Sequence, residues 1–575
     1  MASEVMNKTG FPSVDRPWMQ YYKQFGDITV PDLSVYEYLV YCNKDKPNNT
    51  AITYFDKKYT YAQMFEMIET VAKGFRAMGI KPGDVVNVVS IPCVASTLTF
   101  YALNKIGAVA DYINVLSTEK DFVHYFEGSK AKVVITLNLF ASKVLTAAKN
   151  VSTVEKIVTF ELSDYAPLKI KIGLALKTRK MDKSYLEDSR VTKFADVIKA
   201  GASLPKTDYK KDPQSVAIYA HTGGTTGFPK TVLLSDKAMN SVAHQYRCIM
   251  PHGENPTFLN IVIPFVVYGL LTCMHMPFAL GANVIIIPKF EASEWKSYFE
   301  KYHFNFTAAV PAWVSPMLGD SSLDGVDMSC MDYIAVGGDG CTNDLEEQCT
   351  QFFNDHGSKS ELHKGYGMTE VGATAVSTYP YANKVGSVGI PFPLNNFMIY
   401  DTETGKECQY GKVGEICMQA ASQMIGYKDN EEENKNFTRI HEDGSEWIHT
   451  GDLGYIDEDG FIFLVGRIKR IIMTFHEGTG YKVFPNIPEE VIATHAAIQD
   501  VCVVEMTNDE QSRLKAFVSL KNGVDMPTEK VEAEIRDIVE AELPAYQQPL
   551  MYEFRDELPL TAAGKVDYRT LEEEA

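Results

Sequence analysis

The segment from Thr60 to Leu137 constrains the fold more than any other part of this chain. Short apolar runs suited to buried parallel strands are separated there by stretches with apolar residues at helical spacing. In order, the expected elements are helix 60–80, strand 85–91, helix 96–107, strand 108–115, helix 119–130 and strand 131–137. Alternating helices and apolar strands predict an α/β fold built on a largely parallel sheet. Thr60 stands where a residue can cap the first helix.

The length of 575 residues is too great for one ordinary core, so we expect more than one domain. The chain is 45% hydrophobic, with 30 Phe and 31 Tyr, which is ample for a large packed interior. We place the domain boundary directly after 465–470. Beyond it, strand-like 501–506 and 515–520 and an amphipathic helix at 531–543 could fold alone. The predicted domains are therefore 1–468 and 469–575.

The formal charge of −20 argues against nucleic acid as a partner, because a negative field repels phosphate backbones. The ten cysteines form no CxxC pair, so neither a zinc site nor a disulfide framework is expected. The first residues lack the apolar core of a signal peptide, and no apolar run of about 18 residues follows. We therefore expect a cytoplasmic protein.

Residues 168–180, LKIKIGLALKTRK, carry five basic and no acidic side chains among apolar ones. Amphipathic basic segments of this kind can touch a membrane surface. The alternation of Lys and Ile fits a strand or a connector equally well, and the segment is short. Membrane association is therefore the less favoured interpretation.

Residues 219–230, YAHTGGTTGFPK, are the most informative for function. Glycines let the backbone pass close to a bulky anion, and N–H groups, hydroxyls and an ammonium supply donors for phosphate oxygens. Taken alone, the run also fits a flexible surface loop. It does not fit the Walker motif of nucleoside triphosphatases, because Pro229 precedes Lys230 where that motif needs glycine.

The run resembles the phosphate loop of the adenylate-forming superfamily, which includes acyl-CoA synthetases, aryl-CoA ligases, luciferases and the adenylation domains of peptide synthetases. The family's other motifs are matched by AVGGDG (335–340), KGYGMTEVG (364–372), WIHTGDLGYIDEDG (447–460), GRIKR (466–470) and LPLTAAGKVDYRTL (558–571). The resemblance implies a large multi-sheet N-terminal domain, a small mobile α+β C-terminal domain and an active site between them.

The resemblance also assigns roles at the nucleotide site. Tyr366, followed by Gly367, would stack on adenine, Thr369 would contact the α-phosphate, and Glu370 would hold Mg²⁺, which favours few carboxylates plus substrate phosphates. Asp452 would bind the ribose hydroxyls, with Arg467 as a second contact. The phosphate loop and the adenine wall would be formed by Thr222, Gly223, Gly224, Thr225, Thr226, Gly227, Lys230, Gly338, Asp339 and Gly340.

For the reaction, the resemblance implies two steps: a carboxylate and ATP give acyl-AMP and pyrophosphate, and a thiol then displaces AMP. Lys565 would bridge the substrate carboxylate and the α-phosphate, with Thr369 and Glu370 as its catalytic partners. Lys469 matches the hinge about which the C-terminal domain would rotate. Gly480 and Lys482 lie where the pantetheine tunnel is expected. ATP, Mg²⁺ and coenzyme A are the implied cofactors.

IPFVVYGL (263–270) matches the acyl-site motif, but Val266 stands where many CoA ligases have His or another aromatic residue. The Asp that pairs with a substrate ammonium in peptide synthetases is absent, so amino-acid activation is not expected. We therefore expect an apolar acid, fatty or aromatic. The predicted acyl pocket consists of Phe265, Val266, Val267, Tyr268, Trp313, Val336 and Gly337.

Two further departures concern the phosphate loop and the acceptor. Thr231 follows Lys230 where the family has glycine, a minor change. About four residues are inserted around 476–479, in the hairpin that lines the pantetheine tunnel, with His476 and Glu477 expected in an exposed loop.

Coenzyme A is the preferred acceptor, and a carrier-protein phosphopantetheine and an aryl substrate remain alternatives. A nucleotide-binding protein without turnover is disfavoured, since both Lys565 and Glu370 are present. Chain length of the acid, oligomeric state and pathway stay open.

Overall fold

The computed structural model describes residues 8–222, 229–338, 340–476, 479–508, 511–521, 523–524, 526–561 and 565–575. Six residues predicted to contact the nucleotide fall outside these ranges: Gly223, Gly224, Thr225, Thr226, Gly227 and Asp339.

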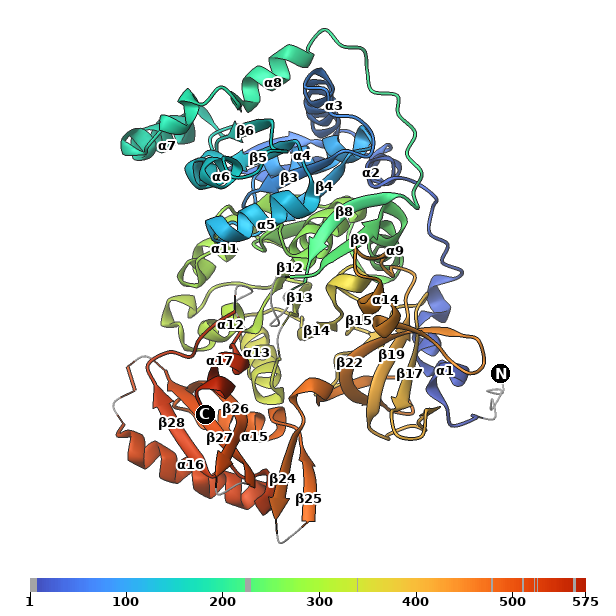
Figure 1. The fold of residues 1–575 in the computed structure, drawn as a ribbon, viewed down its shortest axis with the longest axis vertical. Helices are drawn as coiled ribbons and strands as arrows, with labels where there is room; N and C mark the ends of the chain where they lie inside the picture. The colour runs from blue at the N-terminus through green and yellow to red at the C-terminus, as the bar shows by residue number, and fades with distance from the viewer. Residues whose placement is uncertain are drawn as a thin grey trace.

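An eight-stranded sheet contains the three strands expected between Thr60 and Leu137 (Figure 1). The six strands from β8 to β7 are parallel, and β9 and β20 add antiparallel pairs at one edge. The α/β prediction is confirmed. In spatial order the strands are β20 (Gly426–Tyr427), β9 (Thr231–Ser235), β8 (Val216–His221), β4 (Val109–Ile113), β3 (Val85–Val89), β5 (Val133–Leu137), β6 (Lys156–Phe160) and β7 (Val191–Lys193).

A nine-stranded sheet packs beside it, with its central strands also parallel. Ligands of open α/β sheets bind outside the carboxyl ends of such strands, which here include the ends of β13 and β14. In spatial order the strands are β16 (Ile390–Pro391), β15 (Val376–Ser377), β14 (Leu362–Tyr366), β13 (Tyr333–Val336), β12 (Phe306–Ala309), β10 (Thr257–Asn260), β11 (Asn283–Ile286), β1 (Thr50–Tyr54) and β2 (Lys57–Thr60).

A third sheet is antiparallel and lies to the right of the centre in Figure 1, beside β14 and β15. It carries the predicted ribose motif on its longest strand, β22. Its strands are β18 (Lys406–Glu407), β17 (Asn396–Asp401), β19 (Gly414–Gln419), β22 (Glu446–Ile456) and β21 (Thr438–Ile440), with β23 (Ile462–Arg467) paired to β22.

Seventeen α-helices occur in the described part of the chain, most of them covering the faces of the first two sheets. They are α1 (Pro12–Asp15), α2 (Val35–Asn43), α3 (Tyr61–Ala77), α4 (Val94–Lys105), α5 (Glu119–Ser129), α6 (Ala141–Ala148), α7 (Leu168–Lys177), α8 (Phe194–Gly201), α9 (Asp236–Ile249), α10 (Met276–Leu280), α11 (Trp295–Tyr302), α12 (Pro311–Val314), α13 (Asn343–Asp355), α14 (Glu431–Phe437), α15 (Asn486–Ala493), α16 (Thr528–Glu542) and α17 (Tyr568–Glu573).

Helix α3 begins where the sequence predicts, because Thr60 caps it. The Thr60 side chain accepts from the Gln63 N–H, and the Gln63 side chain accepts from the Thr60 N–H, which makes a capping box. The face with Met64, Ile68 and Phe75 is fully buried. Local capping and apolar spacing together account for this element.

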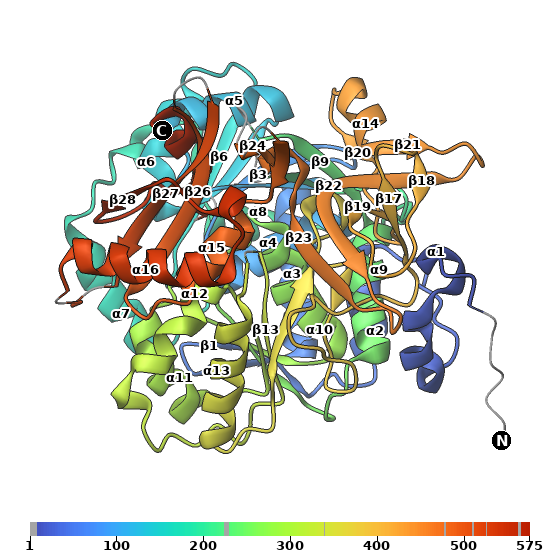
Figure 2. The ribbon, with the colours of Figure 1, turned by 90° about the horizontal axis from the view of Figure 1, so that it is seen from below.

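The elements after β23 form their own hydrophobic core, separate from the core that spans Trp18 to Ile462. Figure 2 shows β26, β27, β28 and α16 to one side and the sheet of β17, β19 and β22 to the other. The strands and helix expected at 501–506, 515–520 and 531–543 are present. The domain boundary at 468/469 stays a prediction. The strands are β24 (Ile472–His476), β25 (Thr479–Val483), β26 (Ile498–Asn508), β27 (Gln511–Leu520) and β28 (Met551–Arg555).

The basic segment 168–180 is helical, as α7 and a following 3₁₀ turn (Thr178–Lys180), rather than a strand or an irregular connector. None of the helices in the described ranges is both long enough and apolar enough to cross a membrane.

Candidate active site

The carboxylate of Asp452 lies at the junction of the predicted nucleotide motifs. Asp452 on β22 is paired in register with Arg467 on β23, and Arg467 Nε lies 2.9 Å from Asp452 Oδ1. The Tyr366 hydroxyl donates to Asp452 Oδ2 at 2.7 Å. Burial raises the pKa of Tyr366 well above its usual range, so the phenol stays a donor. Three residues predicted from separate motifs therefore meet around one buried carboxylate.

Glu370 lies one turn beyond Tyr366, in the 3₁₀ segment Thr369–Val371. The chain turns sharply at Gly367, where a Cβ would lie 2.1 Å from the Ala373 carbonyl oxygen, so glycine is required. The Glu370 carboxylate is buried and accepts from the Tyr427 hydroxyl at 2.7 Å. Burial raises the pKa of Glu370, and the charges of Lys230 and Arg467 act in the opposite direction.

The two ends of the predicted phosphate loop are tied together. The Thr222 N–H donates to the Lys230 carbonyl at 3.1 Å, and the Lys230 N–H donates to Thr222 Oγ1 at 3.1 Å. The Lys230 ammonium forms an ion pair with Glu433 on α14 and lies 4.8 Å from the centre of the Tyr427 ring. Thr222 and Lys230 are thus held at the same point, beside the pair of Glu370 and Tyr427.

Tyr427 is a contact that sequence reasoning missed. It touches both Glu370 and Lys230, two residues assigned to different motifs. A tyrosine in GYKDNEEEN carries no chemical signal of its own, and the pairing of β20 with β9 is what brings it here. Only the sheet register could have revealed its position.

The predicted acyl side of the site centres on Gly337, at the carboxyl end of β13. A Cβ at this position would lie 3.6 Å from the Gly365 carbonyl oxygen and 3.7 Å from the Tyr268 hydroxyl, so both groups face it across a narrow space. Tyr268 begins a π-helix (Tyr268–His275), a form often found at functional sites. The next residue, Gly338, has φ of +83°, which favours glycine.

The other predicted acyl-pocket residues divide into two groups. Phe265, Val267 and Val336 are buried, and Val266 is partly buried against the same core. Trp313 makes its ring contact with Phe290, at 4.9 Å between centroids, and its carbonyl accepts from Trp295 Nε1 at 2.8 Å. The structure therefore brings Tyr268 and Gly337 together, and the place of Trp313 in the acyl pocket stays a prediction.

The C-terminal candidates lie on exposed positions. Lys565 is exposed, and its N–H donates to Thr561 Oγ1 at 3.2 Å. Lys469 is exposed in the 3₁₀ turn Ile468–Arg470, and Gly480 is exposed on β25. Lys482 forms an ion pair with Glu403, 2.7 Å away, on the loop that joins β17 to β18. The roles assigned to these residues stay predictions.

The insertion predicted around 476–479 falls between two paired strands. Strands β24 and β25 pair antiparallel, with His476 opposite Thr479. His476 is exposed, as expected, but belongs to a strand rather than to a loop. Glu477 lies outside the described residues.

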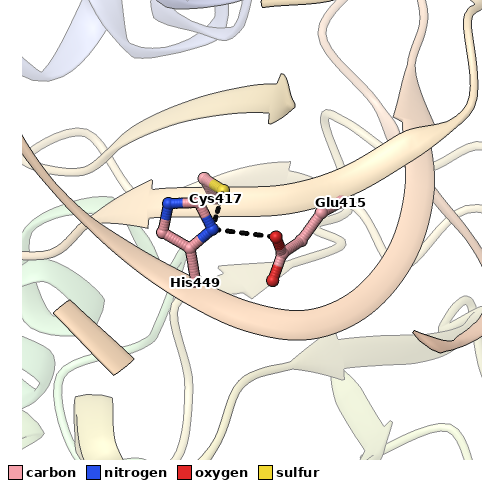
Figure 3. Close-up of side chains that lie close together, drawn as sticks. All are labelled: Glu415, Cys417 and His449. Carbon is pink, nitrogen blue, oxygen red and sulfur yellow. Dashed lines mark hydrogen bonds and ion pairs between the residues drawn. The ribbon is translucent and has the colours of Figure 1, made fainter. Parts of the chain in front are cut away.

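A buried polar network next to Asp452 was also missed (Figure 3). Glu415 on β19 accepts from His449 Nδ1 at 2.8 Å with one carboxylate oxygen and from the Gly451 N–H at 3.0 Å with the other. The pKa of Glu415 is lowered overall. Burial acts to raise this pKa, but the hydrogen bond and the charge of His449 outweigh the effect of burial. Cys417 Sγ lies 3.5 Å from His449 Nδ1, and His441 Nε2 lies 3.0 Å from His449 Nε2.

This network stabilises a bulge between β19 and β22, which orients the side chain of Asp452. The register between β19 and β22 shifts between Glu415 and Cys417, and Gly451 has φ of +72°. Bulges redirect the side chain that follows them. Glu415, Cys417 and His449 place ligand-type atoms within 4.8 Å of one another, but these atoms bond to each other, so we interpret the group as a positioning network.

We expect Glu415→Ala to leave the side chain of Asp452 less precisely positioned, because the hydrogen bond to the Gly451 N–H is lost. Hydrogen bonds to a charged group contribute about 1.5–3 kcal/mol, so the KM for ATP should rise about tenfold or more, with a smaller change in kcat. Glu415→Gln, which keeps an acceptor for Gly451, should restore most of the loss. Initial rates at varied ATP measure both. An unchanged KM for ATP in Glu415→Ala, beside the exposed control Glu446→Ala, would contradict the positioning role.

Comparison with known sequence families is decisive for this chain. Residues 41–428 match the family described as AMP-binding enzyme, and residues 488–565 match the AMP-binding enzyme C-terminal domain. The chain belongs to the AMP-binding enzyme family. The first match covers the first two sheets and part of the third, and the second covers most of the elements after β23.

Curated relatives of this AMP-binding enzyme are acyl- and aryl-CoA ligases. It is 30% identical to the long-chain-fatty-acid–CoA ligase of Bacillus subtilis (strain 168), over 97% of this chain and 98% of that protein. It is 28% identical to 4-coumarate-CoA ligase 1 of Narcissus pseudonarcissus, over 89% of this chain and 88% of the relative.

Two solved structures have a similar fold along almost their whole length. The anthranilate CoA ligase AuaEII in complex with anthranoyl-AMP has a TM-score of 0.80 at 21% identity, over 96% of this chain and 98% of that one. ATP-bound MatB from Rhodopseudomonas palustris has a TM-score of 0.79 at 21% identity, over 94% and 99%. At this identity the likeness shows the adenylate-forming fold.

Proposed function

We propose that this AMP-binding enzyme is an acyl-CoA synthetase that activates an apolar carboxylic acid, a fatty acid in the first instance. The observation that carries the proposal is the contact of Asp452 with both Tyr366 and Arg467, beside the buried Glu370. A carboxylate so placed can accept from two ribose hydroxyls once a nucleotide displaces its present partners. The whole-length similarity to a long-chain-fatty-acid–CoA ligase supports the same reading.

Two displacements make up the proposed reaction. An oxygen of the acid attacks the α-phosphorus of ATP, the bond to the β-phosphate oxygen breaks, and pyrophosphate leaves. The sulfur of coenzyme A then attacks the acyl carbon, loses its proton, and AMP leaves with the electrons of the broken mixed-anhydride bond. Lys565, carried by the C-terminal elements, is assigned to the charge that develops in the first step.

Glu370 is the residue we assign to Mg²⁺. Its side chain is buried, and a single carboxylate suffices because Mg²⁺ takes its other ligands from water and substrate phosphates. When bound, the ion would supply positive charge to the phosphate oxygens. Lys230, held near Glu370, would contribute the second positive charge at the phosphates.

The residues predicted to form the acyl pocket favour an apolar substrate. Phe265, Val267 and Val336 carry no polar group, and Tyr268 and Gly337 leave a narrow space between them. The identities of 30% to a fatty-acid ligase and 28% to a 4-coumarate ligase are too close to separate the two classes of acid. An aryl-CoA ligase is therefore the second candidate for the substrate.

The test is pyrophosphate release with ATP, Mg²⁺ and a panel of fatty and aromatic acids, with and without coenzyme A. Release that requires an apolar acid and rises with coenzyme A is the expected result. Acid-dependent release that coenzyme A does not accelerate would favour loading of a carrier protein, the alternative raised by the insertion predicted in the β24–β25 hairpin. Absence of release with every acid would overturn the proposal.

Gly337→Val is expected to reduce activity with bulky and long acids more than with short ones. A single Cβ at this position would lie within ordinary contact distance of Gly365 and Tyr268, and two further methyl groups would fill the space between them. We expect bulky and long acids to lose about tenfold or more in kcat/KM, since overpacking costs about 1–3 kcal/mol, with the KM for ATP unchanged. Gly337→Ala is the matched control and should retain the panel. Equal losses for short and long acids would contradict this assignment.

A further inference from the structure

Helix α7 exposes an apolar stripe to solvent. None of its ten residues is buried. Leu168, Ile172 and Leu176 are 73%, 55% and 67% exposed. They are spaced four residues apart, so they lie on one face of the helix. Three large aliphatic side chains aligned in this way form a continuous patch, which a monomeric protein rarely presents without a use. We call this stripe the outer face of α7.

The opposite side of α7 fixes the outer face in this orientation. Ile170 and, after the helix, Met181 pack against the large hydrophobic core. The Thr178 hydroxyl donates to the Leu174 carbonyl at 2.9 Å and closes the end of the helix. In Figure 1, α7 lies at the upper left margin of the molecule, beyond α6 and far from the C-terminal elements. One side of the helix is therefore packed against the protein, and the outer face is exposed to solvent.

Positive charge flanks the outer face on both sides. Helical geometry places Lys169 on one flank and Lys171 on the other, whereas Lys177 lies farther round the helix, and all three are exposed. Arg179 and Lys180 follow in the next turn, and no acidic residue occurs from Pro167 to Met181. The chain as a whole has a formal charge of −20, so this concentration of basic residues runs against its composition.

We propose that the outer face of α7 and its flanking lysines dock this enzyme on membrane surfaces that contain anionic lipids. An amphipathic helix with Lys and Arg beside an apolar stripe lies in the interface plane, with its apolar side chains among the acyl chains. Lysine ammonium groups then meet lipid phosphates, which offsets the repulsion expected for an acidic protein. Docking is a property separate from the proposed ligase activity and is measured without it.

A second copy of the chain is a less suitable occupant. Stable protein interfaces bury about 800 Å² on each partner, which a single helix of ten residues does not provide. Two copies meeting through α7 would also bring their lysines together. The charge pattern therefore favours an anionic lipid surface over self-association.

The experiment is co-sedimentation of the full chain with vesicles, either of phosphatidylcholine alone or of phosphatidylcholine mixed with phosphatidylglycerol. We expect binding to the mixed vesicles, weak binding to the neutral ones, and loss of binding as salt shortens the range of the attraction. No binding to the mixed vesicles, or equal binding to both compositions, would overturn the proposal.

Two triple variants test the two parts of the surface. Leu168→Ser/Ile172→Ser/Leu176→Ser and Lys169→Gln/Lys171→Gln/Lys177→Gln should each abolish most binding. Each lysine is expected to contribute about fivefold, and three roughly a hundredfold. The matched controls are Ile440→Ser, which is 76% exposed, and Lys359→Gln/Lys406→Gln/Lys412→Gln, which removes the same charge elsewhere. Equal losses in variants and controls would contradict a docking role for α7.

Pyrophosphate release with a water-soluble acid, measured without vesicles, serves as the check that the variants fold. We expect it to be unchanged in both triple variants, since α7 contributes no residue to the proposed site. Vesicle binding by a chain with no ligase activity would uphold docking and overturn the proposed function, so the two failures are distinguishable. A variant that changes the oligomeric state of the free protein instead of vesicle binding would point to self-association and overturn the proposal.

Discussion

Lys565→Ala is expected to reduce acyl-AMP formation by about two to three orders of magnitude, the usual cost of removing one group that stabilises transition-state charge. Negative charge accumulates on the α-phosphate oxygens as the carboxylate attacks, and the ammonium of Lys565 is the group we assign to it. Formation of acyl-CoA from preformed acyl-AMP should be affected little, because that step develops its charge on the carbonyl oxygen of the acyl group. Pyrophosphate release and thioester formation, measured separately, give the two rates.

The control for this prediction is a lysine on the same C-terminal elements. Lys530 is exposed on α16, 3.7 Å from Glu534, and Lys530→Ala should leave both steps unchanged. Lys565→Arg retains the charge but not the shape, so a partial activity is expected. Equal loss of both half-reactions in Lys565→Ala would show that the lysine acts on the fold or on a shared step, and would contradict the role proposed here.

Asp452→Ala is expected to raise the KM for ATP by about a hundredfold or more, because hydrogen bonds from two ribose hydroxyls to a charged group are worth about 1.5–3 kcal/mol each. Asp452 also holds Tyr366 and Arg467, so the change leaves a buried phenol and a guanidinium without this partner. The free energy of unfolding should fall as well, and thermal unfolding measures it independently of ATP.

Two further variants separate binding from stability. Asp452→Asn keeps an acceptor of the same shape and should recover much of the stability but less of the ATP affinity, since the charge is lost. Asp459→Asn, at the turn between β22 and β23, should leave the KM for ATP unchanged. An unaltered KM for ATP in Asp452→Ala would rule out the ribose contact, whatever the change in stability.

The sequence alone predicted the elements that short-range physics controls. Thr60 and Gln63 lie three residues apart, and the capping box they form needs only local backbone geometry. The apolar runs at 85–91 and 131–137 became adjacent parallel strands because each is uniform enough to be buried on both faces. Where Lys and Ile alternate at 169–172, the period fits more than one structure, and the helical form of α7 could not be chosen in advance.

Candidate residues were predictable where a whole motif carries the chemistry. Asp452, Arg467 and Tyr366 came from three motifs that resemble a known family, and the structure brings them together around one carboxylate. The phosphate-loop glycines and Asp339 lie outside the described residues, so that part of the prediction is untested. Trp313 was also predicted for the acyl pocket; its ring contacts Phe290, and its role stays a prediction.

Only the tertiary structure showed the contacts between residues that belong to no recognisable sequence motif. Glu415 and His449 are 34 positions apart, and Glu370 and Tyr427 are 57 apart. Their pairing depends on sheet register and on a bulge, and a slip of one residue would turn each side chain to the other face. Likewise, periodicity shows that α7 has two apolar sides, but not which of them the core covers. Local patterns determine elements and motif chemistry, whereas partners and exposed faces follow from how the elements pack.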